Sequence, residues 1–278
     1  MPGTLYVVAT PIGNLEDVTL RALRTLREVS VIAAEDTRRT SRLLQHYSIS
    51  TPTTSLHEHN ETARTPGLIQ RLLAGESIAV VSDAGTPVVS DPGAGLVAAA
   101  HAAGIRVEPI PGPSAALAAI SGSGIGGDGF LFVGFPPSKA GARRGWLSSL
   151  ADEGRPLVMY EAPHRIRATL EDMLVALGDR TVALGRELTK AHEQLVVRPI
   201  SEHLAKMSEG RGEFTLVVSP PVEVGLTVTV PSAGDVGREF GRLTEIDGLS
   251  RREAIRSLAA KYGIKARQAY NLVEEHFK

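Results

Sequence analysis

The sequence predicts an α/β fold with two domains, followed by a small helical unit. Short apolar, β-branched runs alternate with polar loops and helical patterns as far as about residue 219, which is typical of strands buried on both faces of a sheet. A Gly- and Ser-rich stretch at 121–129 interrupts this alternation, and such a stretch is too flexible for the interior of an element. We therefore expect domains over 1–122 and 123–222, and a linker with helices over 223–278.

The composition is that of a globular protein without disulfide or thiolate chemistry. The chain has 278 residues, 42% hydrophobic and 22% charged, and no Cys, which excludes disulfides and Cys-ligated zinc. The formal net charge of −1 predicts that any RNA binding comes from a local basic patch. No apolar run reaches the roughly 20 residues of a membrane helix. The first residues lack the basic region of a signal peptide, so we expect a cytoplasmic protein that does not bind membranes.

Strands alternate with helices through the first half of the chain. Thr19 and Ser114 precede two of the helices, and both residue types cap helix amino termini with their side-chain oxygens. Because ligands bind beyond the carboxyl ends of strands in open α/β sheets, the loops that follow the strands form the expected site. We expect strands at 5–10, 29–34, 78–81 and 105–110, and helices at 20–28, from 38 onward, and at 66–73, 96–103 and 115–120.

The loop at 82–95 is the most distinctive of these connections. It contains Asp83 and Asp91 but no cation, whereas pyrophosphate loops combine glycines and bare N–H groups, often with a lysine. Two carboxylates would repel a phosphate but suit ribose hydroxyls or a positive ligand. S-adenosylmethionine carries a sulfonium, an ammonium and a ribose, so it fits this loop better than NAD or ATP. On this loop alone, the alternative that both aspartates only cap turns stays open.

A second charged cluster follows the strand at 29–34. The residues at 35–40 are Glu-Asp-Thr-Arg-Arg-Thr, and Arg38, Arg39 and Arg42 stand at the start of a helix, where cations oppose the macrodipole. Because this placement costs stability, it favours a functional role over a solvated face.

The segment at 53–61 contains two histidines, His57 and His59. This spacing can hold a metal when a strand places both rings on one face. No third ligand with matching spacing is evident, so we expect no metal. A polar loop that lines the site is the better interpretation, and an ordinary exposed loop is the alternative.

The second half repeats the alternation of strands and helices with other residues at the strand ends. We expect strands at 130–133, 157–160, 181–184 and 216–219, and helices ending at 150 and spanning 166–177. Lys139, Arg143 and Arg144 form a basic segment at the start of the first of these helices.

The last part of the chain predicts a linker and two helices. Residues 220–234 form the linker, with one possible short strand, and helices follow at 250–263 and 265–277, as in a helix-turn-helix unit. Ser250 and Glu253 fit a capping box. Basic residues outnumber acidic ones from Arg238 onward, which suits RNA, although a solvated docking domain is the alternative.

Several short strings occur in order between the first predicted strand and about residue 219. They are ATPIGNL (9–15), AEDTR (34–38), HEHN (57–60), SDAGTP (82–87), SDPG (90–93), YEAPHR (160–165), RELTK (186–190) and GEFT (212–215). Together they resemble the motifs of bacterial small-subunit ribosomal RNA cytidine 2′-O-methyltransferases, a family of the tetrapyrrole methylase superfamily. Several strings in one order make a far more specific signal than any one of them alone.

The resemblance implies a fold, a cofactor and a reaction. It implies two α/β domains of the tetrapyrrole methylase type with S-adenosylmethionine in the cleft between them, and a homodimer. The implied reaction is methylation of the ribose 2′-oxygen of a decoding-centre cytidine in 16S rRNA of the small ribosomal subunit. In the superfamily's cofactor loop Thr86 replaces an acidic residue, so Asp83 takes over the polar role. The implied cofactor-binding residues are Pro11, Asp83, Thr86, Val89, Ser114, Ala115, Glu161, Ala162, Leu188, Phe214 and Thr215.

The general base stays open among four residues. Orientation of the acceptor against the methyl carbon can supply about 7–11 kcal/mol, and a base typically adds about 10²–10⁴-fold. Glu35, Asp36, Glu187 and Lys190 are the candidates, the lysine only if its pKa is depressed. The RNA contacts that we expect are Arg38, Arg39, His57, His59, Lys139, Arg143, Arg144, Arg251 and Arg252.

Two other functions remain possible from the sequence. A tetrapyrrole methyltransferase would use the same cofactor fold, although the helical tail and the arginines at 38–39 argue against it. A non-catalytic ribosome-binding factor would have retained the fold without binding the cofactor.

Overall fold

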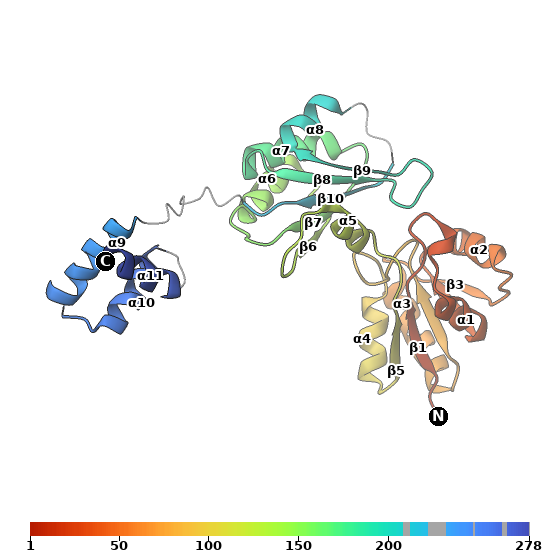
Figure 1. Ribbon diagram of the computed structural model, residues 1–278. Helices are drawn as coiled ribbons and strands as arrows, with labels where there is room; N and C mark the ends of the chain where they lie inside the picture. Colours follow the sequence, from red (N-terminus) through yellow and green to blue (C-terminus); the bar gives the residue numbers. More distant parts are fainter. Residues whose placement is uncertain (208–211, 222–231, 247, 263–265, 278) are drawn as a thin grey trace. The chain divides into compact units, whose positions relative to one another are not determined.

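The computed structural model describes residues 1–207, 212–221, 232–246, 248–262 and 266–277. The chain divides into two compact units, Met1–Pro221 and Val222–Lys278. Within its described residues the first unit contains two five-stranded sheets with helices, and the second unit is helical (Figure 1). The predicted α/β class with helices at the carboxyl end is confirmed.

All strands of the first sheet run parallel, in the order β3-β2-β4-β1-β5. They are β1 (Thr4–Val8), β2 (Val31–Ala34), β3 (Thr53–Ser55), β4 (Ile78–Val81) and β5 (Arg106–Ile110). Since parallel strands end at the same edge, the loops after β1, β2, β4 and β5 gather there.

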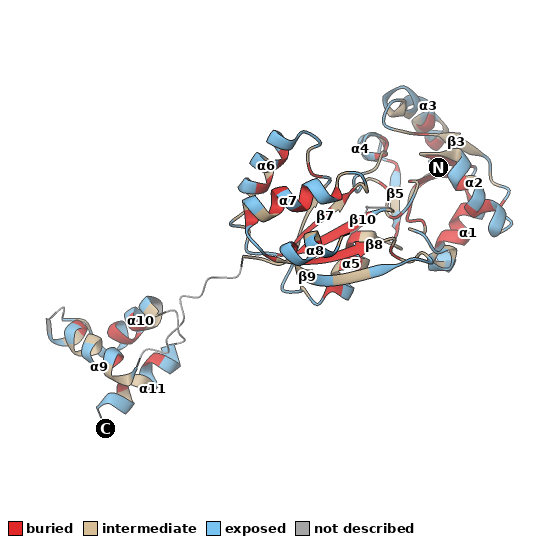
Figure 2. Cartoon of the chain, turned by 90° about the horizontal axis from the view of Figure 1, so that it is seen from above, coloured by how far each residue is buried: buried red, intermediate tan, exposed pale blue. Residues whose placement is uncertain are grey.

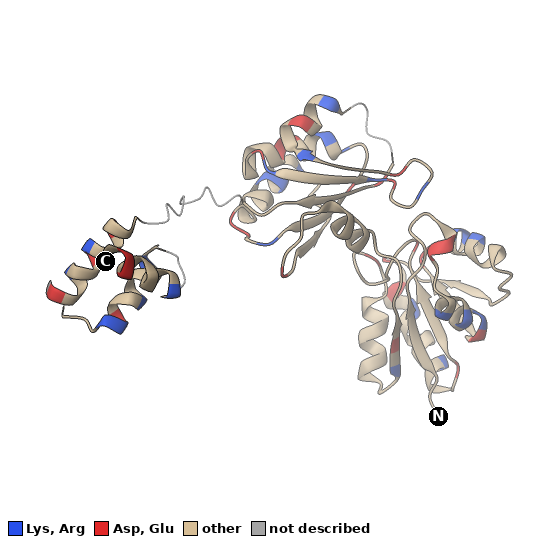
Figure 3. Ribbon diagram, in the orientation of Figure 1, with Lys and Arg blue, Asp and Glu red and all other residues tan. Residues whose placement is uncertain are grey.

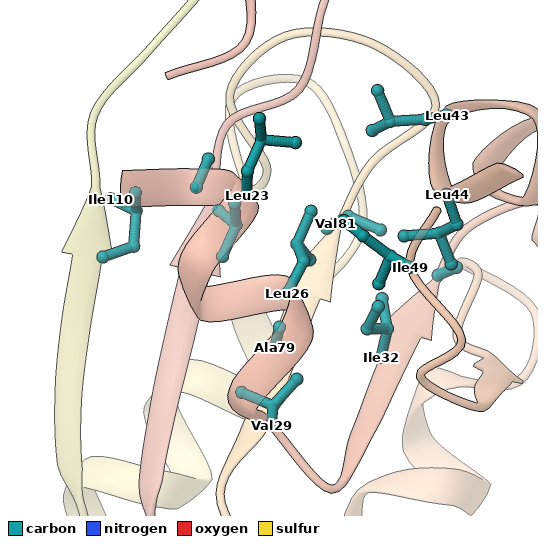
Figure 4. Packing of buried hydrophobic residues seen from close by; sticks show 13 residues of the cluster. Leu23, Leu26, Val29, Ile32, Leu43, Leu44, Ile49, Ala79, Val81 and Ile110 are labelled. Carbon is teal, nitrogen blue, oxygen red and sulfur yellow. The ribbon is translucent and has the colours of Figure 1, made fainter. Parts of the chain in front are cut away.

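Helices cover both faces of the first sheet. Along β2, Ile32 packs into one apolar cluster with Leu26 (Figure 4), while Val31 and Ala33 pack into another with Leu96. This alternation explains why the strand is apolar at every position. The helices on the two faces are α1 (Leu20–Glu28) and α2 (Thr37–His46), and α3 (Glu61–Leu73) and α4 (Ala94–Ala102); a short 3₁₀ helix, η1 (Leu15–Asp17), precedes α1.

The predicted helix caps are confirmed, but one helix start is wrong. The Thr19 side chain accepts a hydrogen bond from the Ala22 N–H (3.1 Å), and Ser114 accepts one from the Leu117 N–H (3.5 Å). Helix α3 begins at Glu61, not at Pro66. Proline is tolerated there because the carbonyl that it leaves unpaired belongs to the exposed first turn, where water can reach it.

The second sheet is mixed, whereas the sequence led us to expect the alternation of the first half to continue. Its order is β6-β7-β10-β8-β9, and only β6 and β7 pair in parallel. The segment 187–193 between β8 and β9 is too short for a parallel crossover. The strands are β6 (Leu131–Gly134), β7 (Leu157–Glu161), β8 (Thr181–Arg186), β9 (Gln194–Pro199) and β10 (Phe214–Val218), and β9 was not predicted.

Helices also cover both faces of the second sheet (Figure 2). One face holds α6 (Ala140–Ser149), α7 (Ile166–Leu177) and α8 (Ile200–Lys206), of which α8 was not predicted. The other face holds α5 (Ala115–Ser123), whose Ala116 and Ala119 pack against Val158 and Val217. Helix α5 therefore packs on the second sheet, although the predicted boundary at residue 122 assigns it to the first domain.

The second unit has its own apolar core. Val236, Leu258 and Val273 are buried in it. The Ser250–Glu253 capping box is confirmed, because the Ser250 N–H donates to the Glu253 carboxylate (3.0 Å) and the Glu253 N–H to the Ser250 hydroxyl (3.4 Å). The elements are α9 (Ala233–Gly241), the π-helix η2 (Arg242–Ile246), α10 (Arg251–Tyr262) and α11 (Ala266–His276).

The predictions for the linker and for the helices of the tail agree with the structure only in part. Most of the linker at 220–234, with its possible short strand, lies outside the described residues, while α9 and η2 were not predicted. None of the helices in the described part of the chain has both the length and the apolarity needed to cross a membrane.

Candidate functional site

Hydrogen bonds join the loops at the carboxyl edge of the first sheet. Thr10 and Gly85 exchange two backbone hydrogen bonds (2.8 and 2.9 Å), which link the loop after β1 to the loop after β4. The Thr86 hydroxyl donates to the Pro113 carbonyl (3.1 Å), which adds the loop after β5. The loop after β4 is thus fixed on two sides before any ligand binds.

The loop after β2 joins the same network through carboxylates. The Asp83 N–H donates to Glu35 Oε2 (3.0 Å), and the Asp36 N–H donates to Asp83 Oδ1 (3.0 Å). Asp83 Oδ2 lies 3.2 Å from the Arg39 guanidinium. The predicted charged residues of the two loops therefore contact one another directly.

The loop after β4 holds its backbone in strained conformations. Val88 and Ser90 have positive φ values of 74° and 64°, and a β-branched residue is a genuine outlier in that region. Such conformations persist only where the surroundings enforce them, and they cluster at binding and active sites. The strain therefore supports this loop as part of a functional site.

A cavity of about 350 Å³ opens between these loops and the second sheet. All of the predicted cofactor-binding residues except Pro11 line it: Asp83, Thr86, Val89, Ser114, Ala115, Glu161, Ala162, Leu188, Phe214 and Thr215. Asp91, the second carboxylate that the sequence assigned to this ligand, also lines it, and residues that were not predicted for it include Ile12, Ser90, Phe135, Tyr160 and Glu213. We call this space the first cavity.

Acidic groups give the first cavity its charge. Burial raises the pKa of Asp91 to about 6, against a hydrogen bond from Ser82 that lowers it, and the nearby Glu35 and Asp83 raise it further. Asp91 does not cap α4, because the N-cap residue of that helix is Gly93 and the N–H groups of Gly93 and Leu96 donate to the Glu61 carboxylate. The capping alternative therefore fails for Asp91, and a partly buried carboxylate is left facing the cavity.

Aromatic side chains form another part of the wall. The rings of Phe135 and Tyr160 lie 5.5 Å apart, and both line the cavity with Phe214. Burial raises the pKa of the Tyr160 hydroxyl, although hydrogen bonds from Ala116 and Ser114 lower it. No sequence signal marked Phe135, because its 55% exposure and its place after a strand are those of an ordinary loop residue.

The Glu161 carboxylate is used by the protein itself. It accepts hydrogen bonds from the Ala162 N–H (2.7 Å), the Arg165 guanidinium (2.7 Å) and the Thr169 hydroxyl (2.5 Å). Since the side chain is fully buried, Glu161 fixes the turn that presents Ala162 to the cavity.

A second cavity, of about 390 Å³, adjoins the first. The two share Ile12, Arg39, Asp83, Ala84 and Glu213 as lining residues. Its other lining residues are Thr10, Pro11, Gly13, Leu15, Thr40, Arg42, Leu43, Ser82 and Lys190. Three cations, Arg39, Arg42 and Lys190, thus line the second cavity, whereas Arg39 is the one cation among the described residues that line the first.

Lys190 is held in the second cavity by two carboxylates. Its Nζ lies 2.9 Å from Glu187 Oε1 and 2.9 Å from Glu213 Oε2. Burial lowers the pKa of Lys190, but the hydrogen bonds that its ammonium donates to Glu187 and Glu213 outweigh this effect and raise the pKa above its ordinary value. A base would need the opposite shift, so Lys190 is a poor base and a persistent hydrogen-bond donor.

Two of the other predicted bases also have unfavourable pKa shifts. The hydrogen bond from the Arg38 side chain is the largest cause that lowers the pKa of Asp36 to about 2, and Asp36 lines neither cavity. The backbone N–H of Glu213, and then Lys190, lower the pKa of Glu187. Glu35 lines the first cavity, so the structure favours it over Asp36 among the predicted acids.

The turn that carries Lys190 is also strained and closely packed. Glu187 and Thr189 have positive φ values of 50° and 66°. The Asn14 N–H donates to the Thr189 hydroxyl (3.0 Å), and a Cβ on Gly13 would lie 2.4 Å from Lys190 Cγ. Gly13 therefore leaves room for the lysine stem, and the loop after β1 contacts the turn after β8.

The predicted RNA-binding residues of the first unit separate into two groups. Arg39 lines both cavities, and Arg38, Lys139 and Arg144 have exposed side chains. Arg143 is instead 5% exposed, with a guanidinium nitrogen 2.6 Å from Asp172 between α6 and α7. The prediction for Arg143 is wrong because its charge is neutralised inside the fold.

The histidines lie apart from both cavities. The Asn60 amide lies 3.0 Å from His57 Nε2, and the rings of His57 and His59 are 6.0 Å apart. His57 Nδ1 is buried without a hydrogen-bond partner among the described residues. No group of three or more His, Asp or Glu in the described chain could hold a metal.

Glu61, next to these histidines, has a role that the sequence did not reveal. Its carboxylate accepts hydrogen bonds from the N–H groups of Gly93 (3.2 Å) and Leu96 (3.0 Å). It thus caps α4 from α3 and holds the end of the loop that contains Asp91.

The two arginines of the second unit that we predicted to contact RNA lie on α10. Arg251 pairs with Glu274 and lies 5.7 Å from the centre of the Tyr270 ring. Arg252 is exposed. Both are accessible on the surface of this unit, as the predicted RNA contact requires.

Comparisons with known proteins bear on this arrangement. The family model described as tetrapyrrole (corrin/porphyrin) methylases matches residues 4–203. The chain is 47% identical over 274 residues to ribosomal RNA small subunit methyltransferase I of Synechocystis, with 97% of each chain covered. The protein of the same name from Pseudomonas aeruginosa is 50% identical over 222 residues, covering 78% of this chain and 79% of the relative. This chain is a member of the tetrapyrrole methylase family.

The solved structures agree with the family at the level of the fold. The uroporphyrin-III C-methyl transferase of Thermus thermophilus, complexed with S-adenyl homocysteine, superposes with a TM-score of 0.58 at 20% identity. The match covers 80% of this chain and all of that chain. The two sheets are thus those of a tetrapyrrole methylase, and the resemblance inferred from the motifs is confirmed.

Proposed function

We propose that the protein transfers a methyl group from S-adenosylmethionine to the ribose 2′-oxygen of a decoding-centre cytidine, cytidine 1402, of 16S rRNA. The observation that supports this most is the pair of adjoining cavities, of which the first is acidic and aromatic and the second is basic. The relatives named ribosomal RNA small subunit methyltransferase I support methylation of rRNA. The 2′-oxygen and the nucleotide come from the resemblance of the motifs.

The residues of the first cavity fit S-adenosylmethionine. Its volume of about 350 Å³ is within the range of pockets that bury small molecules. Asp91, Asp83 and Glu35 suit the positive charges and the ribose hydroxyls, and the rings of Tyr160 and Phe214 suit an adenine. The amino terminus of α5, at Ser114 and Ala115, suits a carboxylate.

The chain's residues orient the reactants more than they react with them. When bound, the cofactor supplies an electrophilic methyl group. The hydrogen bonds among the loops after β1, β2, β4 and β5 hold the cavity wall in place, and orientation of this kind can lower a barrier by about 7–11 kcal/mol. The carboxylates of Glu35 and Glu213 are the candidate acceptors for the proton that the ribose hydroxyl loses.

A label-transfer assay tests this function. The purified protein, with tritiated S-adenosylmethionine, is expected to label small ribosomal subunits from cells that lack this modification, on a single cytidine ribose. Cofactor binding without label transfer to these subunits would contradict the rRNA assignment. Transfer to a porphyrinoid instead would identify a tetrapyrrole methyltransferase, and failure to bind the cofactor would indicate a non-catalytic ribosome-binding factor.

We further propose that the protein is a cytoplasmic homodimer, as the family resemblance implies. Light scattering of the purified protein is expected to give twice the chain mass of 29.5 kDa. A mass of one chain at micromolar concentration would contradict the dimer without affecting the proposed reaction. Cell fractionation tests the location, and the protein is expected in the cytoplasmic fraction together with the ribosomes.

A further inference from the structure

The second cavity has no assigned ligand, although it meets the first at a common wall. Its lining brings together the loop after β1, the start of α2 and the turn after β8. We propose that it binds the acceptor nucleotide, with Arg42 at a phosphate and the Lys190–Glu213 pair at the ribose hydroxyl. This inference rests on the proposed function and deepens it.

The charges of the second cavity fit a nucleotide. Arg42 is exposed and forms no ion pair with the described residues, so its guanidinium is available to a phosphate. Arginines also gather on the neighbouring α1 and α2 (Figure 3). Leu15 and Leu43 supply apolar wall in the same cavity, which suits the face of a base.

Lys190 and Glu213 are both suited to the ribose hydroxyl, the lysine as a hydrogen-bond donor and the glutamate as a proton acceptor. Lys190 stays an ammonium between Glu187 and Glu213, so it can donate a hydrogen bond to the ribose oxygen as that oxygen reacts. Glu213 lines both cavities, 2.9 Å from Lys190. Its carboxylate therefore stands where the acceptor oxygen would meet the methyl group.

The step balances without another reactant. The 2′-oxygen forms a bond to the methyl carbon, the bond from that carbon to the sulfur breaks, and its electron pair stays on the sulfur. The hydroxyl proton passes to the Glu213 carboxylate, which later releases it to water. Glu213 was absent from the sequence-based candidates, although the GEFT string contains it.

Steady-state kinetics with full-length variants test the assignment. In Arg42→Ala we expect the KM for unmodified small subunits to rise about tenfold with little change in kcat, because one phosphate contact is lost. The salt dependence of RNA binding should also become shallower by about 0.7, the slope of one single-strand phosphate contact. Glu213→Gln should lower kcat by about 10²-fold. Arg42→Ala, whose side chain does not line the first cavity, should keep the wild-type affinity for S-adenosylmethionine.

Arg106→Ala is the matched control. Arg106 is an exposed arginine at the amino end of β5, and so at the opposite edge of the same sheet. We expect its KM and salt dependence to equal those of the wild type. If Arg42→Ala behaves like this control, or if Glu213→Gln keeps wild-type kcat, the assignment of the second cavity is overturned while the proposed function stands. A wild-type protein that binds the cofactor but labels no RNA would overturn both.

Discussion

The two cavities share a wall and yet carry opposite charge. Asp91, Asp83 and Glu35 face the first cavity, whereas Arg39, Arg42 and Lys190 face the second. Asp83 and Arg39 line both and pair at 3.2 Å. A cationic methyl donor and an anionic RNA would therefore be drawn to neighbouring but different places. On the proposed function, the charges of the two cavities would therefore direct the two ligands to separate places.

The difference between the cavities follows from the elements that build them. The first lies where the loops after β4 and β5 meet the ends of β7 and β10. The second lies where the loop after β1 and the start of α2 meet the turn after β8. Helix α2 begins with three arginines within six residues, and this placement makes the second cavity basic.

The largest expected effect is a loss of cofactor affinity that leaves RNA affinity unchanged. Ala115→Trp places an indole in the first cavity, at the start of α5, and should weaken cofactor binding at least 100-fold, or by about 2.7 kcal/mol. Binding of RNA at the second cavity should stay within about twofold. Calorimetry with the cofactor and filter binding with small subunits measure the two affinities.

The control for this substitution is Leu117→Trp on the same helix. Leu117 is 54% exposed and lines neither cavity, so its replacement should leave both affinities unchanged. Equal loss of cofactor and RNA binding in Ala115→Trp would mean that the two ligands do not occupy separate places.

Much of the first cavity could be predicted from the sequence. Its residues lie in contiguous strings at strand ends, so Thr86, Ser114 and Phe214 could be placed by motif and by the rule that strand ends form the site. The caps at Thr19 and Ser114 were also predictable, because a local hydrogen bond decides them.

The second cavity could not be predicted in the same way. Glu213 and Arg42 come from separate parts of the chain, and only the contact between the loop after β1 and the turn after β8 brings them together. The pairing of Arg143 with Asp172 is a contact between two helices, which single-sequence patterns do not specify. The pKa shifts of Lys190 and Asp36 likewise depend on neighbours in space.

The next effect tests the acidic character of the first cavity. Since burial raises the pKa of Asp91 from 3.8 to about 6, the cofactor should bind more tightly as the pH rises through about 6 and this carboxyl ionises. Asp91→Asn should bind the cofactor about tenfold more weakly at pH 7.5, or by about 1.4 kcal/mol, and lose most of that pH dependence. Calorimetry between pH 5 and pH 8 measures both.

Stability gives an independent check on Asp91. A carboxyl whose pKa is raised on folding stabilises the fold below its unfolded pKa of 3.8, and this contribution is lost as the pH rises through about 6. Asp91→Asn should therefore be at least as stable as the wild type at pH 7. A less stable variant with an unchanged pH profile of cofactor binding would show that Asp91 has a structural role only.

A smaller effect on stability and cofactor affinity is expected from Glu61, which does not line the first cavity but holds the end of the loop that does. Glu61→Gln removes the charge that caps α4 through Gly93 and Leu96 and should lower the free energy of unfolding by about 0.5–1 kcal/mol. Cofactor affinity should fall two- to threefold, because the loop that carries Asp91 loses its anchor. Denaturant unfolding and calorimetry measure these changes. Affinity for RNA should not change, and a loss of RNA binding would extend the role of Glu61 to the second cavity.

The smallest expected effect tests whether the second unit, like the second cavity, has a basic residue that contacts RNA. Arg252 is exposed on α10, so Arg252→Ala should raise the KM for small subunits about twofold, as expected for one solvated phosphate contact. The control is Arg238→Ala on α9, where the arginine pairs with Asp235 within one turn. If both variants match the wild type at low salt, where phosphate contacts are strongest, then Arg252 makes no RNA contact. A higher KM for small subunits in Arg252→Ala, with cofactor affinity unchanged, would instead show that the second unit also contacts RNA phosphate.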